Sequence, residues 1–361
     1  MLFRSARNGC ERAVSASGVW MKSLLPPSST VATQQSLTPV PATTPSPMPW
    51  ESLALWRRDA SDSSEWRSVY QHKNVEPGGA TQFVSAILHN NSVSEKVGTL
   101  ALWRIPAPLG GGRLLSPPWR DLQRLNGADN VTGVGSPCTT AIRPGNASPN
   151  GALKLAAGRT TIVEMPCQAG TFAVGDEPLL ARWIGEGAVL SNAIANDTPL
   201  LNLVSGDSLA LWRSTTVIPL TTNSEKTERV VLRNVSQSAR ALQLRIVLEP
   251  GQGNFRALDS GVSSLRFATP KAYCVASPEN KKLACGGSGY GVADDESFIV
   301  DANGAAFDLS LPPGAVLPVD ITFKRTRATP QTDVMVRVFE VDPTQNRALG
   351  GASFVVQAKR Q

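Results

Sequence analysis

The stretch ERVVLRNVSQSARALQLRIVLEPG, residues Glu228–Gly251, is typical of β structure. Apolar and polar residues alternate on both sides of the polar turn NVSQSA, and alternation with a period of two indicates half-buried strands. The stretch ESFIVDANGAAFDLSLPPG, residues Glu296–Gly314, alternates in the same way around Asn303-Gly304. An Asn-Gly pair between alternating strands predicts a β-hairpin. The second half of the chain is therefore expected to be all β.

A six-residue pattern ending in Leu-Ala-Leu-Trp-Arg occurs three times, at Ser52–Arg57, Thr99–Arg104 and Ser208–Arg213. A catalytic motif seldom repeats because one active site needs one copy, whereas a structural strand repeats easily. The three copies are therefore predicted to be strands, with the first and third entering two successive domains. The second would return from a strand at 81–89 through the polar hairpin loop NNSVSEKVG. The unequal separations of the copies exclude a regular repeat array.

Length and composition favour two β-sandwich domains behind a tail. The chain has 361 residues, enough for two domains, and its 30 Gly and 27 Pro favour many short strands with turns. Residues 1–49 are predicted to be a disordered tail ending in a Pro/Ser/Thr-rich linker, because such a composition buries too little apolar surface to fold. Residues 50–206 are predicted to form the first sandwich, with a long irregular loop, and residues 207–361 the second.

The five cysteines suggest an oxidising compartment. None forms a Cys-x-x-Cys pair, which argues against a zinc site. Cys138 and Cys167 are candidates for a disulfide that holds the long loop of the first domain, and Cys274 and Cys285 for one that closes a small hairpin. Two such pairs would indicate an exported protein. The N-terminus shows no clear export signal.

Few residues suggest catalysis or a cofactor. The two histidines, His72 and His89, lie near no nucleophile motif, so no catalytic residue is assigned and an unrecognised hydrolase is kept only as an alternative. No cofactor is expected. The acidic stretch around DANGAAFD is a weak calcium candidate, since calcium takes oxygen ligands at alternate positions, although a plain hairpin explains it as well. The residues of this calcium candidate are Asp294, Asp295, Asp301, Asn303 and Asp308.

Tryptophans in strands are expected in the core, whereas those in loops are candidates for ligand binding. Trp56, Trp103, Trp183 and Trp212 belong to the first group. Trp66 and Trp119 lie in predicted loops, where an indole ring either packs against the rim of the core or, if exposed, stacks on sugars, so carbohydrate binding is the alternative function. Five Asn-x-Ser/Thr sequons also occur, and chance explains that number in a chain rich in Ser and Thr. The sequons begin at Asn90, Asn130, Asn146, Asn196 and Asn234.

Charge and hydropathy exclude other partners. The net charge is +6, and the excess of Arg4, Arg7, Arg12 and Lys22 over Glu11 places half of it in the tail. Basic residues elsewhere are scattered rather than clustered, so no nucleic-acid partner is expected. No apolar run approaches the roughly 18 residues of a membrane-spanning helix, so no membrane span is expected.

The segments SLALWRRDASD, YQHKNVEPGGATQFVSAILHNNSVSEKVGTLALWR and LLSPPW together resemble a module of large secreted bacterial proteins. The segment VVLRNVSQSARALQLRIVL is similar to the cell-adhesion-related (CARDB-like) and other immunoglobulin-like bacterial domains. This resemblance covers most of residues 50–250. It implies two tandem immunoglobulin-like β-sandwich domains with a non-catalytic structural or interaction function, outside the cell or on its surface. The partner would be another protein or a surface polysaccharide.

Overall fold

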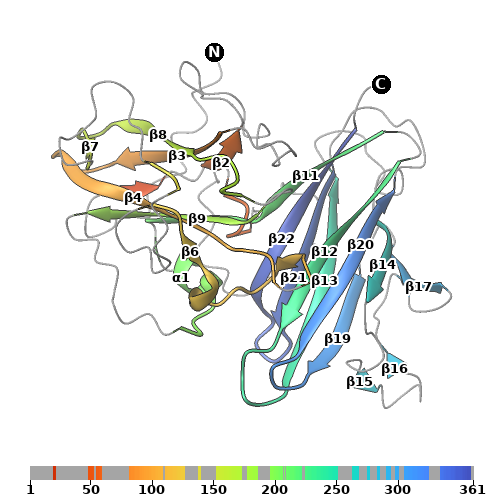
Figure 1. Ribbon diagram of the computed structural model, residues 1–361. Helices are drawn as coiled ribbons and strands as arrows, with labels where there is room; N and C mark the ends of the chain where they lie inside the picture. The colour runs from red at the N-terminus through yellow and green to blue at the C-terminus, as the bar shows by residue number, and fades with distance from the viewer. Residues whose placement is uncertain are drawn as a thin grey trace. The chain divides into compact units, whose positions relative to one another are not determined.

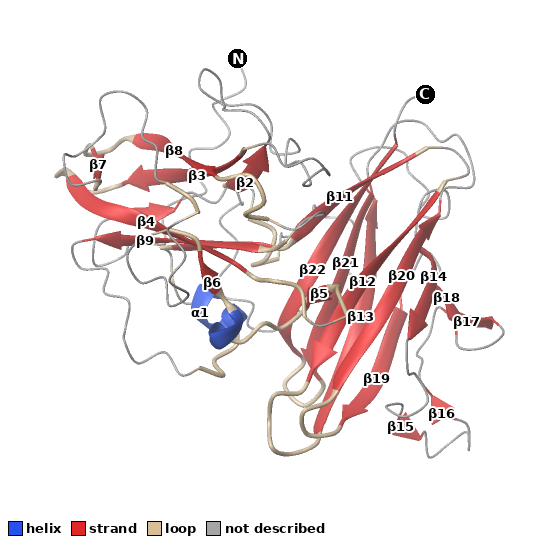
Figure 2. Ribbon diagram, in the orientation of Figure 1, coloured by secondary structure: helices blue, strands red, loops and turns tan. Residues whose placement is uncertain are grey.

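The chain is nearly all β over the part that the structure describes, as the alternating sequence predicts (Figure 2). The computed structural model describes residues 19–21, 48–52, 54–58, 81–108, 110–126, 137–139, 152–172, 177–185, 196–205, 207, 209–221, 224–250, 262–267, 275–276, 283–284, 290–293, 297–300, 305–324 and 334–358.

Contacts between residues divide the chain into two compact units, whose bounds differ from those of the predicted domains. Unit 1 comprises residues 1–32, 42–106 and 118–214, and unit 2 comprises residues 33–41, 107–117 and 215–361. The third Leu-Ala-Leu-Trp-Arg copy lies in unit 1 rather than entering the second domain. In addition, residues 107–117, which were predicted to belong to the first domain, are part of unit 2.

Unit 1 consists of two antiparallel sheets (Figure 1). In one sheet, β3 pairs with β8, with β2 and with β1, a short strand that lies inside the predicted disordered tail. In the other sheet, β4 pairs with β9, β6 and β7, and β9 pairs with β10, which is the third sequence copy. The strands of unit 1 are β1 (Val19–Met21), β2 (Leu55–Arg58), β3 (Gln82–Asn90), β4 (Lys96–Arg104), β6 (Gln123–Arg124), β7 (Leu153–Leu155), β8 (Thr160–Cys167), β9 (Leu179–Gly185) and β10 (Ala210–Arg213). Its helical segments are η2 (Trp119–Asp121) and α1 (Leu200–Ser205).

The core of unit 1 lies between these two sheets. Val84, Ala86 and Leu88 of β3 contribute alternate side chains from one sheet, and Leu100 and Leu102 of β4 contribute them from the other. The predicted burial of the strand tryptophans is confirmed. Their exposed fractions are Trp56 7%, Trp103 4%, Trp183 0% and Trp212 1%.

Unit 2 is built on the same plan, with longer strands (Figure 1). One sheet runs in the order β11-β22-β21-β13-β19, and the other in the order β17-β18-β14-β20-β12-β5. Pairing is antiparallel except that β11 lies parallel to β22 and β5 lies parallel to β12. The larger strands are β11 (Thr215–Leu220), β12 (Glu225–Arg233), β13 (Arg240–Pro250), β14 (Val262–Phe267), β19 (Ala305–Leu311), β20 (Val316–Lys324), β21 (Val334–Asp342) and β22 (Arg347–Ala358). The shorter strands are β5 (Arg113–Leu114), β15 (Val275–Ala276), β16 (Leu283–Ala284), β17 (Tyr290–Ala293) and β18 (Ser297–Val300).

Alternation also builds the core of unit 2. Leu242, Leu244 and Ile246 project from β13, and Val319 and Ile321 project from β20 in the opposite sheet into the same cluster. Burying one such side chain contributes about 1.5–3 kcal/mol. The fold of this unit thus follows directly from the period-two pattern of its sequence.

Three of the predicted turns do not form hairpins, because in each case the two flanking strands lie in different sheets. The loop that starts at Asn90 leads from β3 in one sheet to β4 in the other, and the loop that starts at Asn234 leads from β12 to β13 in the same way. The strands that flank Asn303-Gly304, β18 and β19, are also in different sheets. Both strands of each pair alternate, so the sequence predicts the strands but not their partners. The small hairpin predicted between Cys274 and Cys285 is present, since β15 pairs antiparallel with β16.

A buried asparagine fixes the crossing between sheets in unit 1. Nδ2 of Asn90 donates hydrogen bonds of 2.8 Å to the carbonyl oxygens of Ser94 and Leu155. Its Oδ1 accepts hydrogen bonds from the backbone and the hydroxyl of Ser92, at 3.0 and 2.7 Å. The amide therefore joins the loop to the end of β7, at the position where the chain leaves the first sheet.

Unit 2 repeats this arrangement at Asn234. Nδ2 donates to the carbonyl oxygens of Ser238 and Leu311 at 2.8 and 2.9 Å, and Oδ1 accepts from the backbone and hydroxyl of Ser236 at 3.0 and 2.7 Å. The backbone N–H of each asparagine also bonds to a residue that follows a glycine with positive φ, which is Gly158 (φ 64) in unit 1 and Gly314 (φ 69) in unit 2. The pairings β3–β8, β4–β7, β4–β9 and β9–β10 of unit 1 recur as β12–β20, β13–β19, β13–β21 and β21–β22 of unit 2. The two units are therefore versions of one module.

We predict that Asn90→Ala and Asn234→Ala each destabilise their own unit by about 2–3 kcal/mol, because carbonyl groups are left without donors in a buried site. All eight tryptophans lie at or before Trp212, and none lies in residues 107–117 or 215–361. In urea unfolding, Asn90→Ala should shift the tryptophan-fluorescence transition, and Asn234→Ala should shift the transition in far-ultraviolet circular dichroism.

The exposed neighbours Asn91 and Gln237 supply matched controls. Asn91→Ala and Gln237→Ala should change the free energy of unfolding by less than about 0.5 kcal/mol. Equal effects of Asn90→Ala and Asn91→Ala would show that the buried amide has no special role.

Candidate functional site

Trp119, the described member of the two loop tryptophans, packs against another aromatic ring. It starts η2 and is partly exposed, and its ring centroid lies 5.5 Å from that of Trp103 at an interplanar angle of 59°. The guanidinium carbon of Arg124 lies 4.7 Å from the centroid of the Trp103 ring. Trp119 thus helps to cover a core tryptophan, and its use in carbohydrate binding stays a prediction. Trp66 lies outside the described residues.

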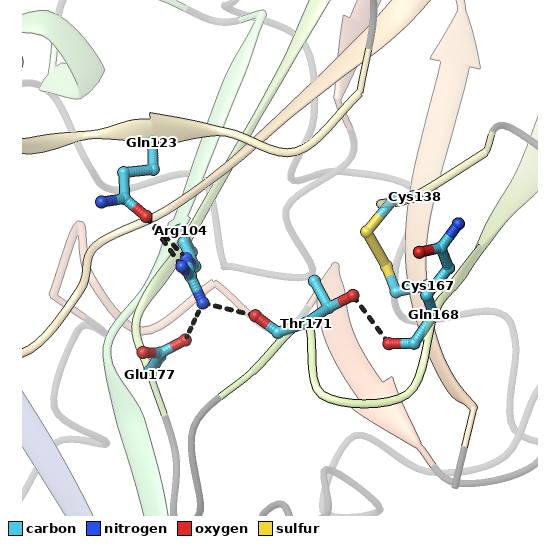
Figure 3. Close-up of polar contacts among 7 residues, drawn as sticks. All are labelled: Arg104, Gln123, Cys138, Cys167, Gln168, Thr171 and Glu177. Carbon is cyan, nitrogen blue, oxygen red and sulfur yellow. Dashed lines mark hydrogen bonds and ion pairs between the residues drawn. A yellow bond between two sulfur atoms is a disulfide. The ribbon is translucent and has the colours of Figure 1, made fainter. Parts of the chain in front are cut away.

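Arg104, which follows Trp103 on β4, is the centre of a polar cluster (Figure 3). Its Nε and Nη2 donate to Oε1 of Gln123 at 3.0 and 2.8 Å. Its Nη1 donates to the carbonyl oxygen of Thr171 and lies 3.6 Å from Oε2 of Glu177. One guanidinium therefore connects β6, the loop after β8 and the segment before β9.

The same loop is held at its other end by a disulfide between Cys138 and Cys167, the pair that the sequence suggested (Figure 3). The backbone N–H of Gln168 donates to the carbonyl oxygen of Pro137 at 2.8 Å. The hydroxyl of Thr171 then donates to the carbonyl oxygen of Gln168 at 2.7 Å. The disulfide and Arg104 thus hold the two ends of one turn, and the cluster can stabilise the rim of unit 1.

The other predicted site residues are not brought together within the described part of the chain. Asp308 is exposed on β19, where its Oδ1 accepts a hydrogen bond of 2.7 Å from Gln243. Within the described ranges, no group of three or more His, Cys, Asp or Glu side chains is arranged to hold a metal ion. Of the two histidines, His89 places Nδ1 2.8 Å from the hydroxyl of Thr160, its cross-strand partner. The remaining residues of these predictions, His72, Cys274, Cys285, Asp294, Asp295, Asp301 and Asn303, lie outside the described residues.

Unit 2 contains a buried carboxylate that the sequence analysis did not single out. Glu340 on β21 is completely buried, and its Oε2 accepts hydrogen bonds from the hydroxyl of Ser116 at 2.9 Å and from Nη2 of Arg240 at 3.1 Å. Burial raises the pKa of Glu340, and the positive charge of Arg240 opposes that rise. A Glu among apolar residues in a strand, VMVRVFEVD, is the sequence signal for it.

We predict that Glu340→Gln removes a pH dependence from unit 2. A raised pKa means that the folded chain binds the proton more tightly than the unfolded chain. Between the ordinary pKa of a glutamate and the raised value, Glu340 therefore makes the folded state less stable as the pH rises. The free energy of unfolding, measured by circular dichroism in urea, should therefore increase for Glu340→Gln relative to the wild type as the pH rises through this window.

Asp342 provides a control of opposite sign on the same strand. A hydrogen bond from the side chain of Thr344 is the largest cause that lowers the pKa of Asp342. Its stabilising contribution is present above the ordinary aspartate pKa and is lost as the pH falls, so Asp342→Asn should lose stability relative to the wild type at neutral pH. Parallel pH curves for Glu340→Gln and the wild type would contradict the prediction.

We also predict that the double variant Cys138→Ser/Cys167→Ser destabilises unit 1. The two cysteines are 29 residues apart in sequence, and loop-closure entropy for a loop of this size gives about 3–4 kcal/mol. The tryptophan-fluorescence transition should shift by this amount. Because reductants would reach the other cysteines, substitution is the cleaner test, and Cys10→Ser is the control. An unchanged transition would show that the turn is held without the disulfide.

Comparisons with known proteins do not place the chain in a family. No protein-family model matches it, and no curated protein matches it.

Among the described residues, no helix is both long and apolar enough to cross a membrane.

Similar solved structures share little with this chain. The collagen adhesin from S. aureus aligns over 78% of this chain and 88% of its own, at 10% identity and a TM-score of 0.21. A family 123 glycoside hydrolase from Clostridium perfringens aligns over 41% of this chain, at 11% identity and a TM-score of 0.25, and only 23% of that chain is spanned. Red sea bream transglutaminase aligns over 78% of this chain and 30% of its own, at 10% identity and a TM-score of 0.19. At these TM-scores, none of the three determines the function of this chain.

Proposed function

We propose that the chain is a non-catalytic structural or interaction module of an exported or cell-surface bacterial protein. The observation that carries the proposal is the repeat of one module, with the same buried asparagine at the same crossing between sheets in both units. A duplicated feature of this kind serves architecture, since a single active site needs one copy.

The strand order supports assigning unit 2 to the immunoglobulin-like sandwiches. In those domains the last two strands and the third strand share one sheet, and the second and fifth strands share the other. Strands β22, β21 and β13 form the first set, and β12 and β20 form the second, with β11 lying parallel to β22. Unit 1 repeats the antiparallel part of this order. The module would act by spacing and by presenting its loops and edge strands to a protein or a surface polysaccharide.

The polar cluster of unit 1 also supports an architectural role. The guanidinium of Arg104 is taken up by Gln123, by the carbonyl oxygen of Thr171 and by Glu177, rather than directed at a ligand. The disulfide at the other end of the turn favours an oxidising compartment, because cytoplasmic thiols are kept reduced.

Thiol trapping in the producing bacterium tests the proposal. Cells are quenched in acid and alkylated with N-ethylmaleimide, and peptides are analysed by mass spectrometry. We expect Cys138 and Cys167 to be protected as a disulfide, and intact cells to yield chain fragments when treated with an external protease. Alkylated Cys138 and Cys167 in a protease-resistant pool would contradict export.

A glycan array separates the proposal from carbohydrate binding. The folded chain should give no signal that depends on Trp119. Binding that is lost in Trp119→Ala, while Arg120→Ala still binds, would replace the structural role by a lectin-like one.

A further inference from the structure

A short segment, residues 110–117, packs on unit 2 although both strands that flank it in sequence, β4 and β6, belong to unit 1. We call it the strap. It begins with Gly110, Gly111 and Gly112, whose φ angles are 89°, 78° and 95°. Residues with a side chain rarely adopt such angles, so the three glycines let the chain turn into the strap without strain.

The strap adds to unit 2 as a strand. Arg113 and Leu114 form β5, which lies parallel to β12 opposite Val230 and Val231. The backbone N–H of Leu115 then donates to the carbonyl oxygen of Val231 at 3.2 Å. Addition of an extended segment to a sheet edge is a common mode of peptide recognition, in which side-chain pockets give the specificity.

Three side chains of the strap, those of Arg113, Leu115 and Ser116, have specific contacts on unit 2. Arg113 donates to the hydroxyl of Thr216, and its guanidinium carbon lies 5.9 Å from the centroid of the Phe354 ring. Leu115 is completely buried in the core cluster of unit 2. Ser116 donates to Glu340 at 2.9 Å. Unit 2 therefore contacts a strap that carries one cationic side chain, two leucines and a hydroxyl group.

Unit 2 is shaped to receive the strap. A Cβ on Gly350 would lie 2.2 Å from the carbonyl oxygen of Leu115 and 2.7 Å from the hydroxyl of Ser116. Gly350 does not have a positive φ, so its backbone conformation does not require glycine. Glycine is required there because any side chain would occupy the space of the strap. At the other end, Arg229 pairs with Asp320 at 2.6 Å and donates to the carbonyl oxygen of Gly110 at 3.0 Å.

We propose that the β12 edge is a strand-acceptor site and that two copies of this chain exchange straps across it. Only Arg113 and Leu114 pair as a strand, and the nearby Pro108 and Pro117 have no N–H with which to extend the pairing. Exchange therefore breaks few backbone hydrogen bonds. A second copy carries the identical strap and the identical edge, so it restores every contact, and mutual exchange closes a symmetric dimer.

Two full-length variants test the exchange. The first, Arg113→Gly/Leu114→Ser/Leu115→Gly, keeps the acceptor edge but has no strap to donate. The second, Gly350→Val, keeps the strap but blocks the edge. Each alone should be a monomer in size-exclusion chromatography with light scattering. An equimolar mixture should form a one-to-one dimer of twice the mass, and adding Leu115→Asp to the Gly350→Val chain should abolish it.

A labelled peptide with the sequence of residues 107–118 gives a second measurement, which also serves if the triple variant does not fold. Its fluorescence anisotropy should rise with the full-length Leu115→Ala chain, and a Leu115→Asp peptide should bind at least tenfold more weakly. Adding Gly350→Val to that chain should remove the binding. If the two variants fold but remain monomers when mixed, the proposed exchange is wrong. If the peptide binds but no dimer forms, the β12 edge would instead accept a strand from another protein. Absence of both signals would show that the strap serves its own chain alone.

Discussion

The crossing between sheets at a buried asparagine is the constraint on which both units depend. At Asn90 and Asn234 the chain leaves one sheet and enters the other. One carboxamide can bond to several backbone groups at this point, because it both donates and accepts from the same planar group. It binds its own loop on one side and the end of β7 or β19 on the other. The two layers of each sandwich are thereby fixed to each other at one edge.

The two units differ in how the rest of the module is completed. In unit 1, a disulfide and the guanidinium of Arg104 hold the turn that follows β8. Unit 2 has the two longest strands, β13 and β22, and residues 113–114 add to it as a strand at the β12 edge.

Local patterns in the sequence predicted the strands and the burial of the strand tryptophans. They did not predict strand partners, because β3 and β4 alternate equally well whether they lie in one sheet or in two. The repeat has one local signal, since Asn-x-Ser-x-Ser occurs at Asn90 and again at Asn234, whereas the Leu-Ala-Leu-Trp-Arg pattern does not follow it. The strap was not predictable, because its strand is two residues long and its flanking Gly and Pro residues are typical of an irregular loop.

The asparagines at the two crossings are also Asn-x-Ser sequons, and this affects the choice of expression host. In a eukaryotic secretory pathway, a glycan attached to the unfolded chain would occupy Nδ2 of Asn90 or Asn234. Both side chains have no exposed surface in the folded state, and each Nδ2 donates to at least two carbonyl groups. A sugar at either position leaves no room for the loop and removes one of the N–H donors. Glycosylation at these two sites and folding of the module are therefore mutually exclusive, so the protein should be expressed in a host that does not glycosylate.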